Sequence, residues 1–284
     1  STRSPARRRT ETTRSLRRRT QGLEEGVVEQ IVGSRNWNAH APLGEGIPAS
    51  DGAAAQNVPR HLVDAVAHLV GSEGRHGTGT VARLEKRFPS HAPPSGVCER
   101  IHVQRTRTPS VVAVVITCLH VIPTHAAART TKVHIGAHVL MLAPDRLFYA
   151  NDCNDVVVCA PAAASVPSFL CPRGWDVSWS QKPLSLVHFP NAVRTPILTS
   201  GQVVAHVSHC FLHTADTLPG SSGAPVFVRV GSKWHWVGIH CEAIDLALPG
   251  RARVPTNAGC SLEVAMRALK HVGYGCAPSS ASWN

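Results

Sequence analysis

Short runs of β-branched residues recur along the chain from about Val97 onward, and each run ends in residues that form turns. Helical patterns do not alternate with these runs. Strands at this spacing without intervening helices predict an all-β barrel or sandwich. The expected strands are Ile101–Val103, Val111–Thr117, Lys132–Leu142, Val156–Val158, Gly201–Val207, Pro225–Val230 and Trp234–His240.

A helix is expected after the last of these strands, over Ser261–Lys270. Ser261 is a suitable N-terminal cap because its hydroxyl can accept a free backbone N–H, and Gly273 lies just past the expected end. The chain has 284 residues, of which 43% are hydrophobic and 17% charged. A chain of this size and composition buries a sizeable core, so fibrous and wholly disordered classes are excluded.

Positive charge is concentrated at the N-terminus. The formal net charge is +11, and residues 1–20 contribute +7 of it through eight arginines against the single acidic residue Glu11. Such a segment cannot offset its ordering entropy, so we expect a disordered tail. Two interpretations stay open: contact with RNA or an anionic membrane surface, and a solvated linker in a longer polyprotein.

Residues 21–95 are predicted to be a linker with marginal helix. Arg60–Val70 carries its apolar residues on one helical face, and Val81–Phe88 is expected to follow as a second short helix. The predicted organisation is therefore a basic tail, this linker, a β-rich domain and a short C-terminal tail, at residues 1–20, 21–95, 96–275 and 276–284.

The cysteines and histidines show no metal-binding or disulfide pattern. Nine cysteines are an odd number, spaced singly without a CxxC pair, which argues against a disulfide framework and favours a reducing compartment. The 17 histidines lack finger-like spacing, so no metal is expected. No apolar run approaches the roughly 20 residues of a membrane-spanning helix. Because the chain has no initiator Met and no signal-peptide pattern, Ser1 is interpreted as a cut end.

Three short segments in the β-rich region carry groups suited to acyl transfer. His120 follows an apolar strand, Asp155 directly precedes the apolar run Val156–Val158, and Ser222 lies in the glycine-flanked segment Thr217–Pro225. A serine hydroxyl is a poor nucleophile until a His within hydrogen-bond reach takes its proton, and a carboxylate fixes the tautomer of that His. We therefore predict a catalytic triad of His120, Asp155 and Ser222.

The glycines beside Ser222 indicate an oxyanion hole. Gly220 and Gly223 allow a tight turn whose backbone N–H groups converge on one point. The N–H groups of Gly220 and Ser222 are the predicted donors, each typically worth about 3 kcal/mol in the transition state.

Two positions of the triad have competitors close by. Asp152 is an alternative to Asp155, which we favour because it directly precedes the apolar strand, whereas Asp152 is suited to capping a turn. Ser221 is an alternative nucleophile, and the Gly-x-Ser-Gly register favours Ser222.

The order and spacing of these residues resemble the chymotrypsin-like serine proteases of small positive-strand RNA viruses, and in particular the polyprotein-processing protease of sobemoviruses and their relatives. That pattern is a His, an Asp or Glu, and then TxxGxSG. Here 34 residues separate His120 from Asp155, 61 separate Asp155 from Thr217, and residues 217–223 fit every fixed position. The resemblance covers roughly residues 97–265 and implies a two-barrel β fold, with the triad in the cleft between the barrels.

Two features depart from the family. Ser221 stands where sobemoviruses often carry a Trp, which is tolerable because that side chain is expected to point away from the nucleophile. No membrane-spanning segment precedes the protease region, which indicates an excised fragment or a relative that anchors differently.

The resemblance also implies a substrate preference. Thr217 and His240 match the pair that binds Glu or Gln before the scissile bond in the resembling proteases, and cleavage before Ser or Thr would agree with Ser1. Asp216 lies where trypsin-like enzymes hold the acid that recognises Lys or Arg, so that specificity stays open. A buried Asp216 would repel a carboxylate, so we favour Glu or Gln, with Asp216 turned to solvent. Residues 257–261 are expected either to close the pocket wall or to form a turn.

The resulting expectation is a viral serine endopeptidase that processes a polyprotein and needs no cofactor, with its protease domain at residues 96–275. It is expected in the host cytoplasm, in association with membrane-bound replication complexes. Its expected partners are the polyprotein substrate and, through residues 1–20, RNA or an anionic membrane. The alternative is an RNA-binding or structural protein on a protease-like fold with a basic arm, which leaves the triad as a coincidence.

Overall fold

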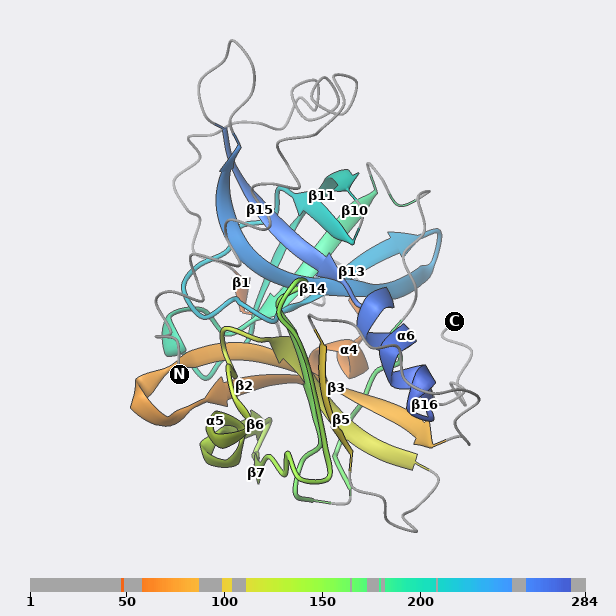
Figure 1. Cartoon of the computed structure of the whole chain (residues 1–284). Helices are drawn as coiled ribbons and strands as arrows, with labels where there is room; N and C mark the ends of the chain where they lie inside the picture. Colours follow the sequence, from red (N-terminus) through yellow and green to blue (C-terminus); the bar gives the residue numbers. More distant parts are fainter. Residues whose placement is uncertain are drawn as a thin grey trace.

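Two antiparallel β-sheets, one above the other in Figure 1, make up most of the chain, and the helix α6 (Glu263–His271) lies beside the place where they meet. The structure is a computed structural model that describes residues 47–48, 58–86, 99–103, 111–163, 165–172, 179, 182–207, 209–246 and 254–276. The predicted basic tail 1–20, most of the predicted linker and nearly all of the C-terminal tail lie outside these residues.

The first sheet holds nine strands in the order β4-β8-β9-β5-β3-β2-β6-β7, with β16 paired to β3. Their bounds are β2 Val66–Val70, β3 His76–Lys86, β4 Glu99–Val103, β5 Val111–Cys118, β6 Lys132–Ile135, β7 His138–Met141, β8 Leu147–Asn151, β9 Val156–Cys159 and β16 Tyr274–Cys276.

The second sheet holds seven strands in the order β1-β11-β10-β13-β14-β15-β12. Because β11 also pairs with β12, the six strands from β10 to β15 close into a barrel, with the short β1 added outside. Their bounds are β1 Ile47–Pro48, β10 Pro183–His188, β11 Ile197–Val207, β12 Cys210–His213, β13 Pro225–Val230, β14 Lys233–Leu246 and β15 Val254–Ser261.

The architecture is the all-β, chymotrypsin-like double barrel with a C-terminal helix that the sequence predicted. Six of the seven predicted strands lie inside observed strands, and Lys132–Leu142 is instead the hairpin of β6 and β7, with a turn at Gly136, whose φ is 54°. Helix α6 begins two residues after Ser261, whose Oγ accepts the N–H of Glu263 at 3.2 Å. Gly273, with φ 89°, follows the helix end, as expected.

The prediction of a helical linker before the β-rich domain is wrong for the described part of that segment. Arg60–Asp64 forms the short α-helix α4 and Ser72–Gly74 the 3-10 turn η1, while residues 66–70 and 76–86 are the strands β2 and β3 in the first sheet. The barrel therefore begins well before residue 96. In β2 the first four residues are buried, so the strand has no alternation of polar and apolar residues. A strand covered on both faces cannot be distinguished from a buried helix by its periodicity.

Besides α4, η1 and α6, the described residues include the short helices α5 and η3. Helix α5 (His125–Thr130) is capped by Thr124, whose hydroxyl accepts the N–H of Ala127 at 3.0 Å. The turn η3 (Pro190–Ala192) follows β10 and contains two left-handed residues, Asn191 at φ 52° and Ala192 at φ 62°. Left-handed conformations cost free energy in residues other than glycine, so η3 is a strained segment.

At least one cysteine forms a disulfide bond, although the sequence argued against a disulfide framework. Cys153 is disulfide-bonded, whereas Cys118, Cys159, Cys210 and three further cysteines are free. An odd number of singly spaced cysteines therefore did not exclude a bridge. Burial raises the pKa of Cys118 and of Cys159 to about 12, so both stay protonated.

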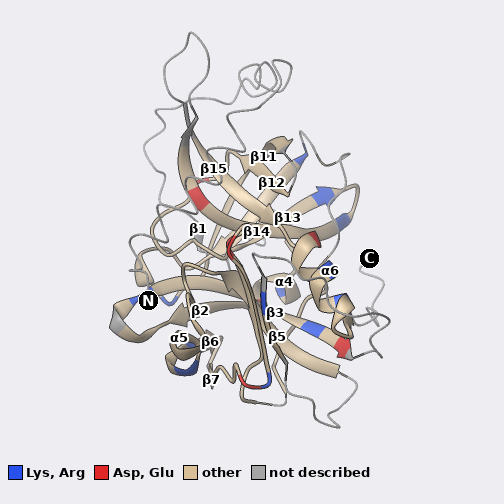
Figure 2. Cartoon of the chain, viewed as in Figure 1, with Lys and Arg blue, Asp and Glu red and all other residues tan. Residues whose placement is uncertain are grey.

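Charged side chains are interspersed over the described part of the molecule. Figure 2 shows basic and acidic residues scattered over both sheets. None of the described helices has the length and apolar character that a membrane crossing requires.

Candidate active site

His120 and Asp155 are brought together by the pairing of β5 and β9. The last residue of β5, Cys118, is the register partner of Val156, the first residue of β9. The residues just beyond these two positions are therefore neighbours, and the N–H of Leu119 donates to the carbonyl of Asp155 at 3.0 Å. Strand pairing alone thus places the imidazole beside the carboxylate.

The Asp155 carboxylate holds His120 through two hydrogen bonds. Nδ1 of His120 lies 2.6 Å from Oδ2 of Asp155, and the backbone N–H of His120 donates to Oδ1 at 3.0 Å. Asp155 is only 3% exposed, whereas the His120 side chain is 33% exposed. Because the carboxylate accepts the Nδ1 proton, Nε2 of His120 is the nitrogen left to accept a proton from a nucleophile.

Asp152, the competing carboxylate, lies at the surface. Its side chain is 53% exposed, and its Oδ1 lies 2.9 Å from the guanidinium of Arg100. This geometry favours Asp155 for the third position, since Asp155 bonds to the His120 ring while Asp152 pairs with Arg100.

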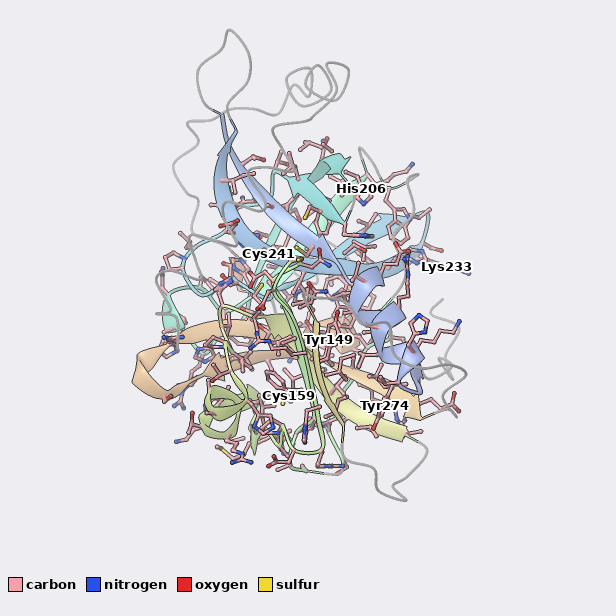
Figure 3. The ribbon with its side chains drawn as sticks, in the orientation of Figure 1. Tyr149, Cys159, His206, Lys233, Cys241 and Tyr274 are labelled. Carbon is pink, nitrogen blue, oxygen red and sulfur yellow. The ribbon has the colours of Figure 1, made fainter. Side chains whose placement is uncertain are left out.

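Ser222 lies in a tight loop between β12 and β13, which we call the Ser222 loop (residues 218–224). Gly220 and Gly223 have φ of 96° and 87°, a region that side-chain-bearing residues rarely adopt. Ser222 is half-buried, and its hydroxyl donates to the carbonyl of Cys241 at 3.2 Å. Figure 3 shows Cys241 where the two sheets meet, so the loop faces the boundary between the barrels.

Two backbone N–H groups of the Ser222 loop, those of Gly220 and Ser222, have no hydrogen-bond partner among the residues that the structure describes. The other N–H groups of the loop donate to acceptors within the molecule; they belong to Leu218, Ser221, Gly223 and Ala224. Unpaired N–H groups on the nucleophilic serine itself and on the residue two positions before it are what an oxyanion hole of this kind requires. They are also the two donors that the sequence predicted.

Ser221, the competing nucleophile, is fully buried in a hydrogen-bond network. Its Oγ accepts the N–H of Leu218 at 3.0 Å and lies 2.6 Å from Nδ1 of His188. Burial lowers the pKa of His188 to about 4, so the ring is neutral near pH 7 and Nδ1 can accept the Ser221 proton. The Ser221 hydroxyl is therefore used to shape the loop, which favours Ser222 as the nucleophile.

Thr217 is fixed by a short chain of hydrogen bonds. Its Oγ1 donates to Oδ1 of Asn257 at 2.7 Å, and Nδ2 of Asn257 donates to the carbonyl of Ala215 at 2.8 Å. Asn257 lies in β15, so residues 257–261 are strand residues and the interpretation of this segment as a turn is wrong. Because the hydroxyl hydrogen of Thr217 is donated to Asn257, this hydroxyl can act toward a ligand only as a hydrogen-bond acceptor.

His240 is buried and paired with a second histidine. Its Nδ1 lies 3.2 Å from Nε2 of His213, and Nδ1 of His213 is buried without a hydrogen-bond partner among the described residues. Burial, reinforced by the charges of neighbouring histidines, lowers the pKa of His213 to about 3 and that of His240 well below its ordinary value. Both rings are therefore neutral near pH 7.

The tautomers of this pair follow from the unpaired nitrogen. In the described part of the chain, Nδ1 of His213 is a fully buried atom without a partner, whereas Nε2 of His240 is not among the fully buried unpartnered atoms, so an unpaired hydrogen is better placed on His240. Nδ1 of His213 is then the bare nitrogen, and its Nε2–H donates to His240. The hydrogen of His240 then lies on Nε2, which has no partner among the described residues. His240 is thus a neutral donor.

Asp216 is exposed, and its backbone carbonyl accepts the hydroxyl of Thr199 at 2.9 Å. The Asp216 residue is therefore turned to solvent, which is the arrangement that the sequence analysis favoured.

Two groups of possible metal ligands occur among the described residues, and in each group at least one member is engaged in another interaction or is held in its protonated form. His102, His125 and Asp145 lie together at the surface, where both oxygens of Asp145 accept hydrogen bonds from Arg129 at 2.7 and 2.8 Å. The second group combines His120 and Asp155 with Cys118, whose raised pKa keeps it a thiol.

Comparison with known proteins gives similarity at the level of structure alone. No family model and no curated protein matches the sequence. Two solved structures of Rv3671c are similar to the chain: the inactive form of a serine-to-alanine mutant from M. tuberculosis H37Rv, and the Rv3671c protease in its inactive form. Each is 14% identical to this chain and has a TM-score of 0.47. The match covers 82% of this chain in both cases, and 96% of the mutant's chain and 99% of the other.

Sequence analysis missed the residues that support the Ser222 loop from behind, chiefly Thr78, Thr117 and His188. Thr78 lies in the segment assigned to a linker, and none of the three belongs to a motif. The contacts of Thr78 and Thr117 depend on how the two barrels meet, and that of His188 depends on pairing within the second barrel; local sequence reveals neither.

Proposed function

We propose that the chain is a serine endopeptidase of the chymotrypsin-like class. The observation that carries the proposal is the Ser222 loop, in which unpaired N–H groups of Gly220 and Ser222 accompany a half-buried serine hydroxyl. The buried Asp155 carboxylate, bonded to the ring of His120, supplies the oriented base that such a serine needs.

In the proposed reaction the Ser222 hydrogen is redirected from the Cys241 carbonyl to Nε2 of His120. Oγ then forms a bond to the substrate carbonyl carbon while its proton passes to Nε2, and the carbonyl oxygen becomes an oxyanion held by the two free N–H groups. His120 gives the proton to the amide nitrogen as the C–N bond breaks, which leaves an acyl-enzyme. Water repeats the sequence, and Asp155 stays ionised throughout.

The hydrogen-bonding groups of Thr217 and His240 favour Gln over Glu before the scissile bond. His240 offers one N–H and Thr217 offers an oxygen lone pair. A carboxamide has one acceptor oxygen and a donating NH₂ group, so it satisfies both, whereas an ionised carboxylate has acceptors only. A carboxylate beside a neutral imidazole would also lack a counter-charge.

We expect the preference for Gln over Glu to increase with pH. A Glu side chain is accommodated when His240 is protonated, and the lowered pKa of His240 makes that form scarcer as pH rises. The ratio of kcat/KM for a Glu peptide to that for a matched Gln peptide should fall by up to about tenfold per pH unit above neutrality. Titration of His120 affects both peptides equally and cancels in the ratio.

Asp216→Asn is the control for this prediction and tests the trypsin-like alternative. Because Asp216 is exposed, the variant should keep the Glu-to-Gln ratio of the wild type. A ratio independent of pH would contradict the assigned pocket. Cleavage of Lys or Arg peptides that is lost in Asp216→Asn would transfer specificity to Asp216.

A fluorophosphonate probe tests the enzyme assignment itself. The wild-type protein should be labelled at Ser222, as mapped by mass spectrometry of peptides, and heat-denatured protein should not. Ser222→Ala should remove the label and the cleavage of Gln-Ser or Gln-Thr peptides together. A folded wild-type protein that is neither labelled nor active would refute the proposal and leave a scaffold or RNA-binding role.

The biological setting that we propose rests on the sequence resemblance. The substrate would be a viral polyprotein cut after Gln or Glu and before Ser or Thr, in the host cytoplasm at membrane-bound replication complexes. Residues 1–20 would bind RNA or an anionic membrane through their arginines, with an affinity that falls with salt. Deleting residues 1–20 should then abolish that binding while peptide cleavage persists.

A further inference from the structure

Thr78 of β3 lies behind the Ser222 loop and is wholly buried. Its backbone N–H donates to the carbonyl of Ser222 at 2.9 Å, and its hydroxyl donates to the carbonyl of Gly220, also at 2.9 Å. The same hydroxyl accepts the N–H of Phe189 at 3.0 Å. Because Oγ1 already receives one hydrogen from Phe189, its own hydrogen is directed to Gly220.

The carbonyl of Thr78 is also used, because it accepts the hydroxyl of Thr117 on the neighbouring strand β5 at 2.6 Å. Every hydrogen-bonding group of Thr78 therefore has a partner at or beside the loop. The residue joins three segments: the first sheet, the end of β10 and the loop that carries Ser222.

The carbonyls of the loop determine where its N–H groups point. In a trans peptide the C=O and the following N–H point in opposite directions, so a donor that holds a carbonyl also sets the direction of the next N–H. Four successive carbonyls are held in this way, by Asn191 N–H, Thr78 Oγ1, Ala224 N–H and Thr78 N–H; they belong to Pro219, Gly220, Ser221 and Ser222.

The two free N–H groups thus owe their direction to this set of bonds. The bond from Asn191 to Pro219, 2.6 Å long, turns the N–H of Gly220 away from η3. The bond from Ala224 to Ser221 does the same for the N–H of Ser222. Thr78 holds the other two peptides of this stretch, through the carbonyls of Gly220 and Ser222. Its bond from the Phe189 N–H also fixes the start of the segment that includes Asn191.

We infer that Thr78 is a positioning residue for the oxyanion hole, acting from the first barrel on the loop of the second. The inference rests on the proposed function. Without the hydroxyl, the Gly220 carbonyl and the Phe189 N–H lose their common partner in a buried place, and the peptide between the two hole donors keeps only one of its two hydrogen bonds, that from the Ser221 N–H to the carbonyl of Leu218. Misplaced donors stabilise the transition state less while substrate binding is unaffected, so kcat should fall and KM should not.

Thr78→Val is the main variant, because valine has the shape of threonine without the hydroxyl. We expect kcat for a peptide substrate to fall about 10- to 100-fold, the range that a misplaced catalytic group commonly costs, with KM within about twofold of the wild type. Inactivation by the fluorophosphonate probe should slow similarly. Thr78→Ser keeps the hydroxyl and should restore kcat to within about threefold of the wild type.

The chain offers a matched control two residues along the same strand. Thr80 is equally buried, and its Oγ1 has no hydrogen-bond partner among the described residues. Thr80→Val should therefore keep the kcat of the wild type. If Thr78→Val does not fold, Thr78→Ala, which introduces no new atoms, replaces it in the comparison.

The results separate this inference from the function on which it rests. A wild-type protein that is neither labelled nor active would refute the proposed function. An active wild type, with Thr78→Val or Thr78→Ala keeping its kcat within about threefold, would refute the positioning role alone. Equal losses in the Thr78 and Thr80 variants, or a Thr78→Ser that is not rescued, would also overturn it.

Discussion

Asp155→Asn is expected to lower kcat by about 10⁴-fold in a protein that stays folded. Asparagine has the shape of aspartate, and its amide oxygen can still accept the backbone N–H of His120. Its NH₂ group would then face Nδ1 of His120, 2.6 Å from the present Oδ2 position, and would donate to that nitrogen. The hydrogen of the ring would be forced onto Nε2, which could no longer take the proton of Ser222.

The matched control is Asp152→Asn, which makes the same chemical change three residues away. Asp152 is exposed and its ion pair with Arg100 is solvated, so activity should stay within about twofold and the free energy of unfolding within about 1 kcal/mol. Both variants are compared by kcat, KM and urea unfolding. A loss of kcat in Asp152→Asn equal to that in Asp155→Asn would mean that the orienting carboxylate is misassigned.

The residues of the site that were predictable from sequence are those fixed by local structure. His120 and Asp155 lie just beyond the ends of strands that pair with each other, and strand ends are visible as the limits of apolar runs. The Ser222 loop needs glycine at two positive φ angles, and glycine at these positions is likewise visible in the sequence. A motif of this kind describes a few neighbouring residues, which is why it could be recognised.

The residues that escaped prediction act across the fold. Thr78 bonds to Gly220 over a separation of 142 residues, and the pairing exists only because β3 passes behind the loop of the other barrel. Thr78 lies in the short run Gly77-Thr-Gly-Thr80, which alternates small and polar residues and matches no catalytic motif, so nothing in it indicates a site. Its strand was also assigned to a linker, because the neighbouring β2 is buried on both faces and mimics a helical pattern.

The proposed specificity pocket was predictable only in part. Thr217 and His240 were expected from the resemblance, but the direction of their hydrogen bonds depends on Asn257 and His213, which come from strands β15 and β12. Whether a pocket offers donors or acceptors is decided by such partners. A sequence pattern that names Thr and His is equally compatible with Glu and Gln, and the proposed preference for Gln rests on these partners.

Gly223→Ala is expected to have the largest effect on stability, because the Ser222 loop touches the first barrel at this residue. A Cβ on Gly223 would lie 2.1 Å from Oγ1 of Thr117 and 2.1 Å from the carbonyl oxygen of Thr78, far inside contact distance. The φ of 87° adds strain for any residue with a side chain. Left-handed strain and overpacking together should lower the free energy of unfolding by roughly 3 kcal/mol or more.

Gly231→Ala separates the clash from the strain, because Gly231 also has a positive φ, 61°, but a Cβ there would meet nothing within 4 Å. Strain alone should cost that variant about 1 to 2 kcal/mol and leave kcat unchanged. Gly223→Ala should in addition lose nearly all cleavage, since the loop can escape the clash only by moving Ser222 and the two hole donors away from the first barrel. Urea unfolding and peptide cleavage of both variants measure the difference. Equal destabilisation of the two variants, with activity retained in Gly223→Ala, would show that the loop does not depend on its contact with Thr78 and Thr117.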